Sequence, residues 1–143
     1  MISIIVVNWN QANYLEKCLE ALHSRPLDEP LEIIVVDNAS SDRSLEMVRS
    51  QFAGVRVIAN SDNLGFARAN NQGLAASHGE FRCLLNNDAE VVGDALARMA
   101  AYLRAHPSVG AVGPQLLNSD GTLQPSGRSF PKIWDVLLQA TGS

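Results

Sequence analysis

Polar side chains that could hold a metal ion or a ligand follow each of four aliphatic runs in the sequence. They are Asn8-Trp9-Asn10, Asp37-Asn38, Asn60 to Asn63, and Asn86-Asn87-Asp88. Any one of these groups is an ordinary loop by itself. In an open parallel α/β sheet, however, ligands bind outside the carboxyl ends of the strands, and loops there carry function. The four groups together therefore predict one site at one edge of a sheet.

Asp88 is the first candidate for a metal ligand. It lies in the run LLNNDAEVV, where an apolar strand gives way to polar residues. Mg²⁺ is typically held by oxygen atoms from one or two carboxylates and from substrate phosphates, so a single Asp88 is chemically sufficient. Glu90 would share the face of Asp88 on an extended chain, whereas a turn would separate them. The alternative is that both acids are solvated loop residues.

Asp37 and Trp9 are candidates for binding a nucleobase. A carboxylate only accepts hydrogen bonds, and uracil and thymine each offer one strong donor, N3–H, so Asp37 could select those bases. Trp9 could provide a face on which a base stacks. The alternatives are an N-cap role for Asp37 before a helix and a core position for Trp9.

The stretch NSDNLGFARANNQG, residues 60–73, could bind an anion. Gly65 directly precedes a predicted helix, whose amino-terminal amides attract anions, and Arg68 could reach a phosphate or a base edge. The alternatives are a tight turn at Gly65, close helix packing at Gly73 and a solvated Arg68. The stretch is not a GxGxxG fingerprint. The first strand-helix turn, NWNQAN, has no glycine either, which argues against a dinucleotide oxidoreductase.

Alternating aliphatic runs and helical periods must position these residues. This pattern predicts an α/β fold with a mainly parallel sheet and helices on both faces. We expect strands at 2–7, 31–37, 55–60 and 80–86, and helices near 15–26, 45–54, 66–77 and 96–103. Turn residues after Pro107, including Asp120-Gly121, predict short extended pieces or a hairpin.

Composition limits the class of protein. The chain has 143 residues, 46% of them hydrophobic, which fits one compact domain. A net charge of −4 with scattered basic residues disfavours nucleic acid as a partner. Aliphatic runs too short to span a bilayer and the lack of a leader predict a cytoplasmic protein. Cys18 and Cys83 lack metal-binding spacing, so we expect reduced, mostly buried thiols.

Other catalytic centres find no support in the sequence. Three histidines, His23, His78 and His106, lie near predicted helix C-termini, where a partial positive charge is favourable, and we assign them no catalytic role. The sequence holds no G-x-S-x-G elbow and no Walker loop, so it gives no support to triad hydrolysis or P-loop chemistry.

Four segments together resemble the donor half of family 2 glycosyltransferases, and especially the rhamnosyltransferase-like branch. They are ISIIVVNWN, EIIVVDNASSD, NLGFARANNQG and LLNNDAEV, and the resemblance covers residues 2–131. It implies a Rossmann-like GT-A fold that binds a nucleotide-diphospho-sugar. It also implies inverting transfer of a sugar from a UDP- or dTDP-linked donor to an acceptor hydroxyl in cell-surface glycan synthesis.

The resemblance also implies roles for individual residues. Asp37 matches the base-binding acid, Trp9 the stacking aromatic, and Asp88 the last acid of the DxD motif, which binds Mg²⁺ or Mn²⁺. Asn86 takes the place of the first acid, and a neutral amide there makes a weaker metal site. The predicted nucleotide-binding set is Asn8, Trp9, Asn10, Asp37, Asn63, Gly65, Arg68, Asn86 and Asn87.

The catalytic general base is not identified in this chain. In similar enzymes it is an acid in an acceptor-binding half, whereas Asp120 fits a turn and Asp135 a cap or a solvated position. We therefore expect a donor-binding domain over 1–131 and an apolar tail over 132–143 that begins an acceptor half. Alternatives are a non-catalytic nucleotide-sugar-binding subunit and a scaffold that dimerises through the tail. Similar proteins use glycan or lipid-linked acceptors, which implies peripheral membrane association.

Overall fold

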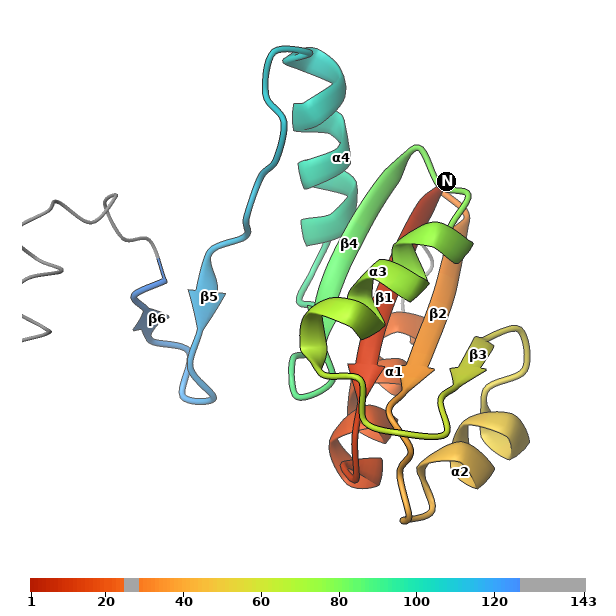
Figure 1. The fold of residues 1–143 in the computed structure, drawn as a ribbon. Helices are drawn as coiled ribbons and strands as arrows, with labels where there is room; N and C mark the ends of the chain where they lie inside the picture. The colour runs from red at the N-terminus through yellow and green to blue at the C-terminus, as the bar shows by residue number, and fades with distance from the viewer. Residues whose placement is uncertain (25–28, 127–143) are drawn as a thin grey trace, which may run out of the picture. The chain divides into compact units, whose positions relative to one another are not determined.

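The computed structural model describes residues 1–24 and 29–126 of the chain (Figure 1). Their contacts form two units, Met1–Val112 and Gly113–Ser143, which are taken separately below. The expected domain boundary at residue 131, the apolar tail with its dimer contact, and Asp135 lie outside the described residues.

The first unit alternates strands and helices as the hydrophobic pattern predicts. Its elements are β1 (Ile2–Asn8), α1 (Ala12–His23), β2 (Leu31–Asp37), α2 (Ser44–Gln51), β3 (Arg56–Ala59), α3 (Phe66–Ala76), β4 (Phe81–Asn86) and α4 (Ala95–Ala105). Every predicted element is present, and most of the differences are at the ends. The second helix ends at Gln51, before the expected Gly54, whose φ of 94° places it in the left-handed region instead.

The four strands form one parallel sheet in the order β3-β2-β1-β4. Alternate residues of the buried strands face opposite sides. Ile4 and Val6 pack with α1, α2 and α4, whereas Ile5 packs with α3. Figure 1 shows α3 across one face of the sheet and α1 and α2 behind it. The α/β fold with helices on both faces is therefore confirmed.

Gly73 brings α3 into close contact with β1. A Cβ atom at position 73 would lie 2.3 Å from Cγ2 of Ile5, a fully buried side chain. We expect Gly73→Ala to lower the free energy of unfolding by about 1–3 kcal/mol, because overpacking outweighs the better helix propensity of Ala. Urea denaturation measures the effect.

Gly110→Ala is the matched control for this prediction, because a Cβ atom there meets no atom of the described residues within 4 Å. It should be neutral or slightly stabilising. If the two variants proved equally stable, the close contact between α3 and β1 would be contradicted.

A carboxylate at the amino end of the sheet is held by several donors. The Oε2 atom of Glu32 accepts from the Ser3 hydroxyl and from the His78 amide at 2.8 Å, and Oε1 pairs with Nδ1 of His78 at 2.9 Å. The hydrogen bonds from the His78 ring, the Ser3 hydroxyl and the His78 amide lower the pKa of Glu32 from 4.5 to about 2. Ser3 in turn accepts from the Gly79 amide at 2.7 Å, so this cluster joins β1, β2 and the start of β4.

We expect this cluster to make stability depend on acid pH. A lowered pKa in the folded state contributes stability that is present above the unfolded pKa and is lost as pH falls through the folded one. The Glu32 contribution should therefore decline between pH 4.5 and about 2. Glu32→Gln should flatten that decline in denaturation curves taken across the range. Glu46→Gln, which changes an exposed acid on α2, should leave the slope as in the wild type.

The second unit contains a short antiparallel hairpin, β5 (Leu116–Leu117) and β6 (Leu123–Gln124). Asp120 lies in its turn, where the carboxylate accepts from the Thr122 amide at 2.9 Å and from the Thr122 hydroxyl at 2.6 Å. Gly121 has a φ of 83°. The hairpin interpretation of Asp120-Gly121 is therefore confirmed.

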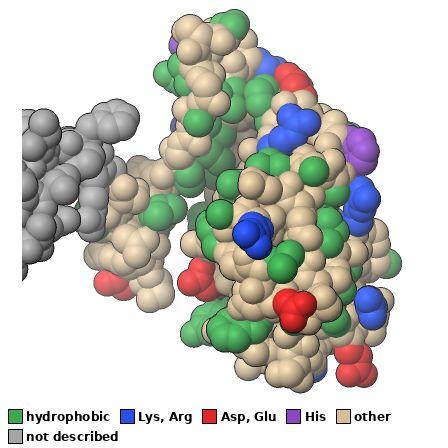
Figure 2. Space-filling view, in the orientation of Figure 1, with side chains coloured by type: hydrophobic (Ala, Val, Ile, Leu, Met, Phe, Trp, Pro, Cys, Tyr) green, Lys and Arg blue, Asp and Glu red, His purple; other side chains and the backbone are tan. Residues whose placement is uncertain are grey.

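The surface charges, the two cysteines and the length of the helices complete the description of the fold. On the face shown in Figure 2, basic and acidic side chains are interspersed among uncharged ones. Cys18 is buried, Cys83 is half-buried, and both are free thiols, as expected. Among the described residues, no helix combines the length and the apolar character needed to cross a bilayer.

Candidate functional site

The strand register brings the predicted residues to one edge of the sheet. Asn8 lies beside Asp37 in the pairing of β1 with β2. Val7 lies beside Asn86 in the pairing of β1 with β4, and Asp37 lies beside Ala59 in the pairing of β2 with β3. The segments that follow these strands therefore start side by side, as expected from a parallel sheet.

The Asp37 carboxylate is buried and oriented by hydrogen bonds. Its residue is 1% exposed. The Oδ1 atom accepts from Asn8 Nδ2 at 3.1 Å and from the Ser40 hydroxyl at 2.6 Å, and Oδ2 accepts from the Ser40 amide at 2.9 Å. A carboxylate has about four acceptor positions, so these three donors leave one position unused.

The helix-cap alternative for Asp37 is not what the structure shows. The helix α2 begins at Ser44, and Asp42 accepts from its amide at 3.0 Å. Asp42 also accepts from the amide of Ala12, the first residue of α1, at 2.9 Å. Although burial raises the pKa of Asp42, hydrogen bonds from Ser44 and Ala12 lower it overall. One carboxylate thus holds the amino ends of two helices.

The loops after β1 and β2 lock together and contain unusual backbone. The Ser40 hydroxyl accepts from the Asn10 amide at 2.9 Å, and the Asn10 side chain accepts from the Ser41 amide at 2.7 Å. Asn10 and Ala39 have φ values of 53° and 61°. This left-handed region costs a non-glycine residue roughly 1–2 kcal/mol, and such backbone is concentrated at functional sites.

Neither Ser40 nor Ala39 was predicted from the sequence to belong to the site. The sequence does hold a signal for Ser40. It is a small hydroxyl residue three positions after Asp37, the acid that ends a strand, and this spacing favours a hydrogen bond back to that acid. The conformation of Ala39 had no signal in the sequence, because alanine gives no hint of positive φ.

Trp9 is exposed to 54% of its surface, so its core alternative is wrong and its ring is free to stack on a ligand. Arg68 is also exposed, and it makes neither a hydrogen bond nor an ion pair within the described part of the chain. Its guanidinium is therefore available to a ligand. Phe66, at the start of α3, is 61% exposed, and sequence reasoning gave it no part.

The start of α3 provides unpaired amides. Gly65 precedes the helix with a φ of 78°, and its amide donates to the Asn63 side chain at 2.9 Å. Within residues 1–24 and 29–126, no side chain caps the amino end of this helix. The first-turn amides of a helix lack partners inside the helix and attract anions. Behind this turn, the side-chain amides of Asn60 and Gln72 exchange two hydrogen bonds of 2.9 Å, which fixes the loop to the helix.

Asp88 lies in a turn directly after β4. The Ala89 amide donates to the Asn86 carbonyl at 3.2 Å, which closes that turn, so the extended-chain arrangement of Asp88 and Glu90 does not apply. Both acids are exposed. Burial first, and then the negative charges of Asp88 and Glu90, raise the pKa of the Cys18 thiol to about 12.

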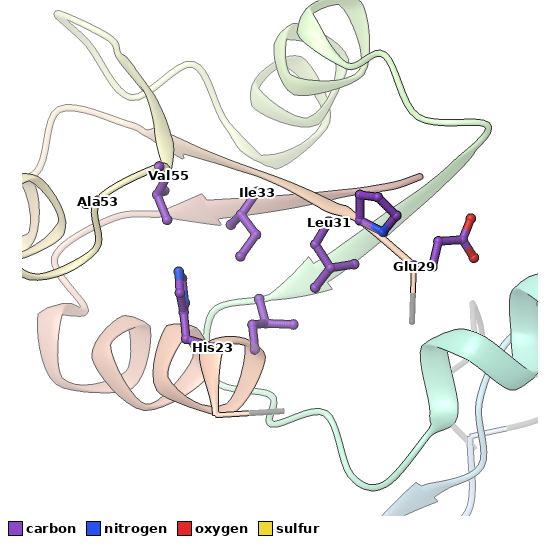
Figure 3. A pocket seen from close by; sticks show the side chains of 9 residues that line it. His23, Glu29, Leu31, Ile33, Ala53 and Val55 are labelled. Carbon is purple, nitrogen blue, oxygen red and sulfur yellow. The ribbon is translucent and has the colours of Figure 1, made fainter. Parts of the chain in front are cut away.

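A cavity lies at the other end of the sheet. A cavity of about 350 Å³ is lined by His23 of α1, by Leu31 and Ile33 of β2, and by residues 53–55 (Figure 3). Leu31 is the first residue of β2, so this cavity is at the amino end of the sheet, opposite Asp37. The predicted residues instead lie at the carboxyl ends of the strands, where Asn8 and Asp37 are buried and Trp9, Arg68 and Asp88 are exposed.

Comparison of the sequence with known proteins gives consistent matches. A family model described as glycosyl transferase family 2 matches residues 3–141. An uncharacterised protein of Sinorhizobium fredii is 34% identical over 132 residues, which cover 89% of this chain and 14% of that protein. The N-acetylglucosaminyl-diphospho-decaprenol L-rhamnosyltransferase of Mycobacterium tuberculosis is 24% identical over 144 residues, which cover 93% and 47%. The chain spans less than half the length of either relative.

Solved structures share the fold. The mannosyltransferase PcManGT from Pyrobaculum calidifontis, in complex with GDP-Man and Mn²⁺, matches with a TM-score of 0.68 and 30% identity over 76% of this chain and 33% of that one. TarS 1-349 of S. aureus, in complex with UDP-GlcNAc, matches with a TM-score of 0.67 and 27% identity over 74% of this chain and 32% of that one.

Proposed function

Because the chain belongs to glycosyl transferase family 2, we propose that its first unit binds the nucleotide-diphospho-sugar donor of an inverting sugar transfer. One observation carries this proposal. Asp37 of β2 and Asn8 of β1 lie side by side, and Asn87, next to Asp88, donates to Asn8 at 2.9 Å. A candidate base-binding group and a candidate metal ligand thus share one edge of the sheet.

The base end of this site would take uracil or thymine. The remaining acceptor position on the Asp37 carboxylate suits the N3–H donor of those bases, and the exposed ring of Trp9 offers a stacking face. The donor is then a UDP- or dTDP-linked sugar. Asn10 shapes the loop beside the base through its bond to Ser41.

The diphosphate would lie between the start of α3 and the turn after β4. The unpaired amides that follow Gly65 and the exposed Arg68 suit an anion. Asp88 fits Mg²⁺ or Mn²⁺, since one carboxylate together with diphosphate oxygens is a normal ligand set for Mg²⁺. Asn86, an amide in the place of a second acid, makes the protein's own share of the ligands small. A bound metal ion would offset charge developing on the leaving diphosphate.

The acceptor hydroxyl must lose its proton to a general base. We assign that role to no residue of the described chain, because Asp120 is held by Thr122 in its hairpin. The relative from Mycobacterium tuberculosis carries a diphospho-decaprenol acceptor in its name. A glycan or lipid-linked acceptor in cell-surface glycan synthesis, used at the cytoplasmic face of the membrane, is therefore our proposal for this protein.

Calorimetric titration with UDP, dTDP and GDP, each with and without Mn²⁺, tests the donor site. We expect UDP and dTDP to bind more tightly than GDP, and Mn²⁺ to strengthen binding. Absence of binding to all three nucleotides would overturn the proposal.

A second candidate function is nucleotide-sugar binding without transfer. It is favoured by the amide at Asn86, which stands where a second acid would strengthen the metal site. Release of the nucleoside diphosphate from UDP- and dTDP-sugars distinguishes the two, because a transferase hydrolyses its donor slowly in water and a binding domain does not.

A further inference from the structure

A continuous chain of hydrogen bonds links the two ends of the proposed donor site. Asn87 Nδ2 donates to Asn8 Oδ1 at 2.9 Å, and Asn8 Nδ2 donates to Asp37 Oδ1 at 3.1 Å. Asn87 directly precedes Asp88 in the turn after β4. The chain therefore crosses from the turn that carries the candidate metal ligand, through β1, to the candidate base-binding carboxylate of β2.

Asn8 is the centre of this chain, and its side-chain amide is engaged by other side chains. Its residue is 0% exposed. Both hydrogens of its amide nitrogen are used, one on Asp37 and one on the Ser40 hydroxyl at 3.2 Å. Because a carboxylate accepts only, Asp37 fixes which end of the Asn8 amide faces it. The oxygen of Asn8 must then face β4, where Asn87 supplies the donor.

This chain of hydrogen bonds makes the position of the Asp37 carboxylate depend on the position of Asn87. Buried hydrogen-bond networks are rigid, and their members move together because breaking one bond leaves a buried group unsatisfied. A ligand that shifts the turn at Asp88 therefore shifts Asn87, the orientation of Asn8 and, through it, Oδ1 of Asp37.

We infer that Asn8 is a positioning residue that couples metal binding at the turn after β4 to recognition of the base by Asp37. This inference rests on the proposed function. It adds that a divalent metal ion changes how strongly one base is preferred over another, as well as how tightly the diphosphate binds. The same coupling must act in reverse, so the correct base strengthens metal binding.

The test compares base preference with and without Mn²⁺. For the full chain, calorimetry gives the ratio of the dissociation constants for GDP and UDP under both conditions. In the wild type, Mn²⁺ should raise this ratio at least about fivefold, the lower end of usual coupling between sites. In Asn87→Ala, which cuts the chain but leaves all hydrogen bonds of Asp37 in place, Mn²⁺ should leave the ratio unchanged.

Asn13→Ala is the matched control. It removes an exposed asparagine of α1 that accepts from Arg43 at 2.8 Å, and it should keep the wild-type dependence on Mn²⁺. Asn87→Ser serves the same purpose as Asn87→Ala if the latter does not fold, because its side chain is too short to reach Asn8.

The outcomes separate this inference from the proposed function. If the wild type binds the nucleotides but its ratio does not respond to Mn²⁺, or if Asn87→Ala responds as the wild type does, the coupling through Asn8 is wrong and the donor site stands. If the wild type binds no nucleoside diphosphate, the proposed function fails and the inference falls with it.

Discussion

Asp88→Ala is expected to abolish the part of nucleoside diphosphate binding that depends on Mn²⁺. Asp88 is an exposed carboxylate in the turn after β4, and in our proposal it is the main protein ligand of the metal ion. Loss of groups that merely support a metal ligand costs about 10–100-fold in affinity, so loss of the ligand itself should cost about 100-fold or more. Titration with UDP with and without Mn²⁺ measures the effect.

The fold should tolerate this change. Surface substitutions away from caps and buried networks usually alter stability by no more than about 0.5 kcal/mol. Asp94→Ala removes an equal charge, from a side chain that is 71% exposed beside α4, and it should bind UDP and Mn²⁺ as the wild type does. If Asp88→Ala kept the full response to Mn²⁺, the metal ion would have to bind elsewhere, and the assignment of Asp88 would be wrong.

Asp37→Ala is expected to weaken both the fold and base recognition. The substitution leaves the Asn8 amide nitrogen and the amide and hydroxyl of Ser40 without their acceptor. Each unsatisfied buried group costs about 1–3 kcal/mol, partly recovered where water reaches the loop, so we expect the free energy of unfolding to fall by about 3 kcal/mol. Guanidinium denaturation measures this loss.

Asp37→Asn separates recognition from stability. It keeps the shape of the side chain but replaces one acceptor oxygen with a donor, so it should lose less stability than Asp37→Ala. Because its remaining oxygen is engaged by the loop, the preference for UDP over GDP should fall in both variants. If Asp37→Ala unfolded like the wild type, the hydrogen-bonding role of Asp37 in the fold would be contradicted. If either variant kept the full preference for UDP, its role in base recognition would be contradicted.

The layers of this fold could be predicted from the sequence, because buried strands and helix faces leave recognisable patterns of apolar residues. Aliphatic runs such as 2–7 and 31–37 are buried on both faces, and only a parallel sheet covered by helices needs such runs. The strand-end positions of Asn8 and Asp37 followed from the same pattern. In a parallel sheet, residues at equal heights on neighbouring strands must lie side by side.

What the sequence could not predict depends on long-range side-chain partners. Asn8 and Trp9 are adjacent polar and aromatic residues, yet the first is fully buried in a network and the second is half exposed. Asp42 lies beside the start of the second helix, but its bond to Ala12 of the first helix joins residues far apart in the chain. Such contacts follow from register and loop geometry, which composition and period do not encode.

The contact between Gly73 and Ile5 also has an evolutionary consequence. One small volume is shared by a helix residue and a strand residue far apart in the sequence, so the effect of changing either depends on which side chain the other carries. An alanine at position 73 should be tolerated once position 5 has lost the Cγ2 methyl group that it would strike. Either change alone is destabilising, because a smaller residue 5 leaves a cavity in the core and a larger residue 73 overpacks the contact. The two changes together should cost less than the sum of the two single changes.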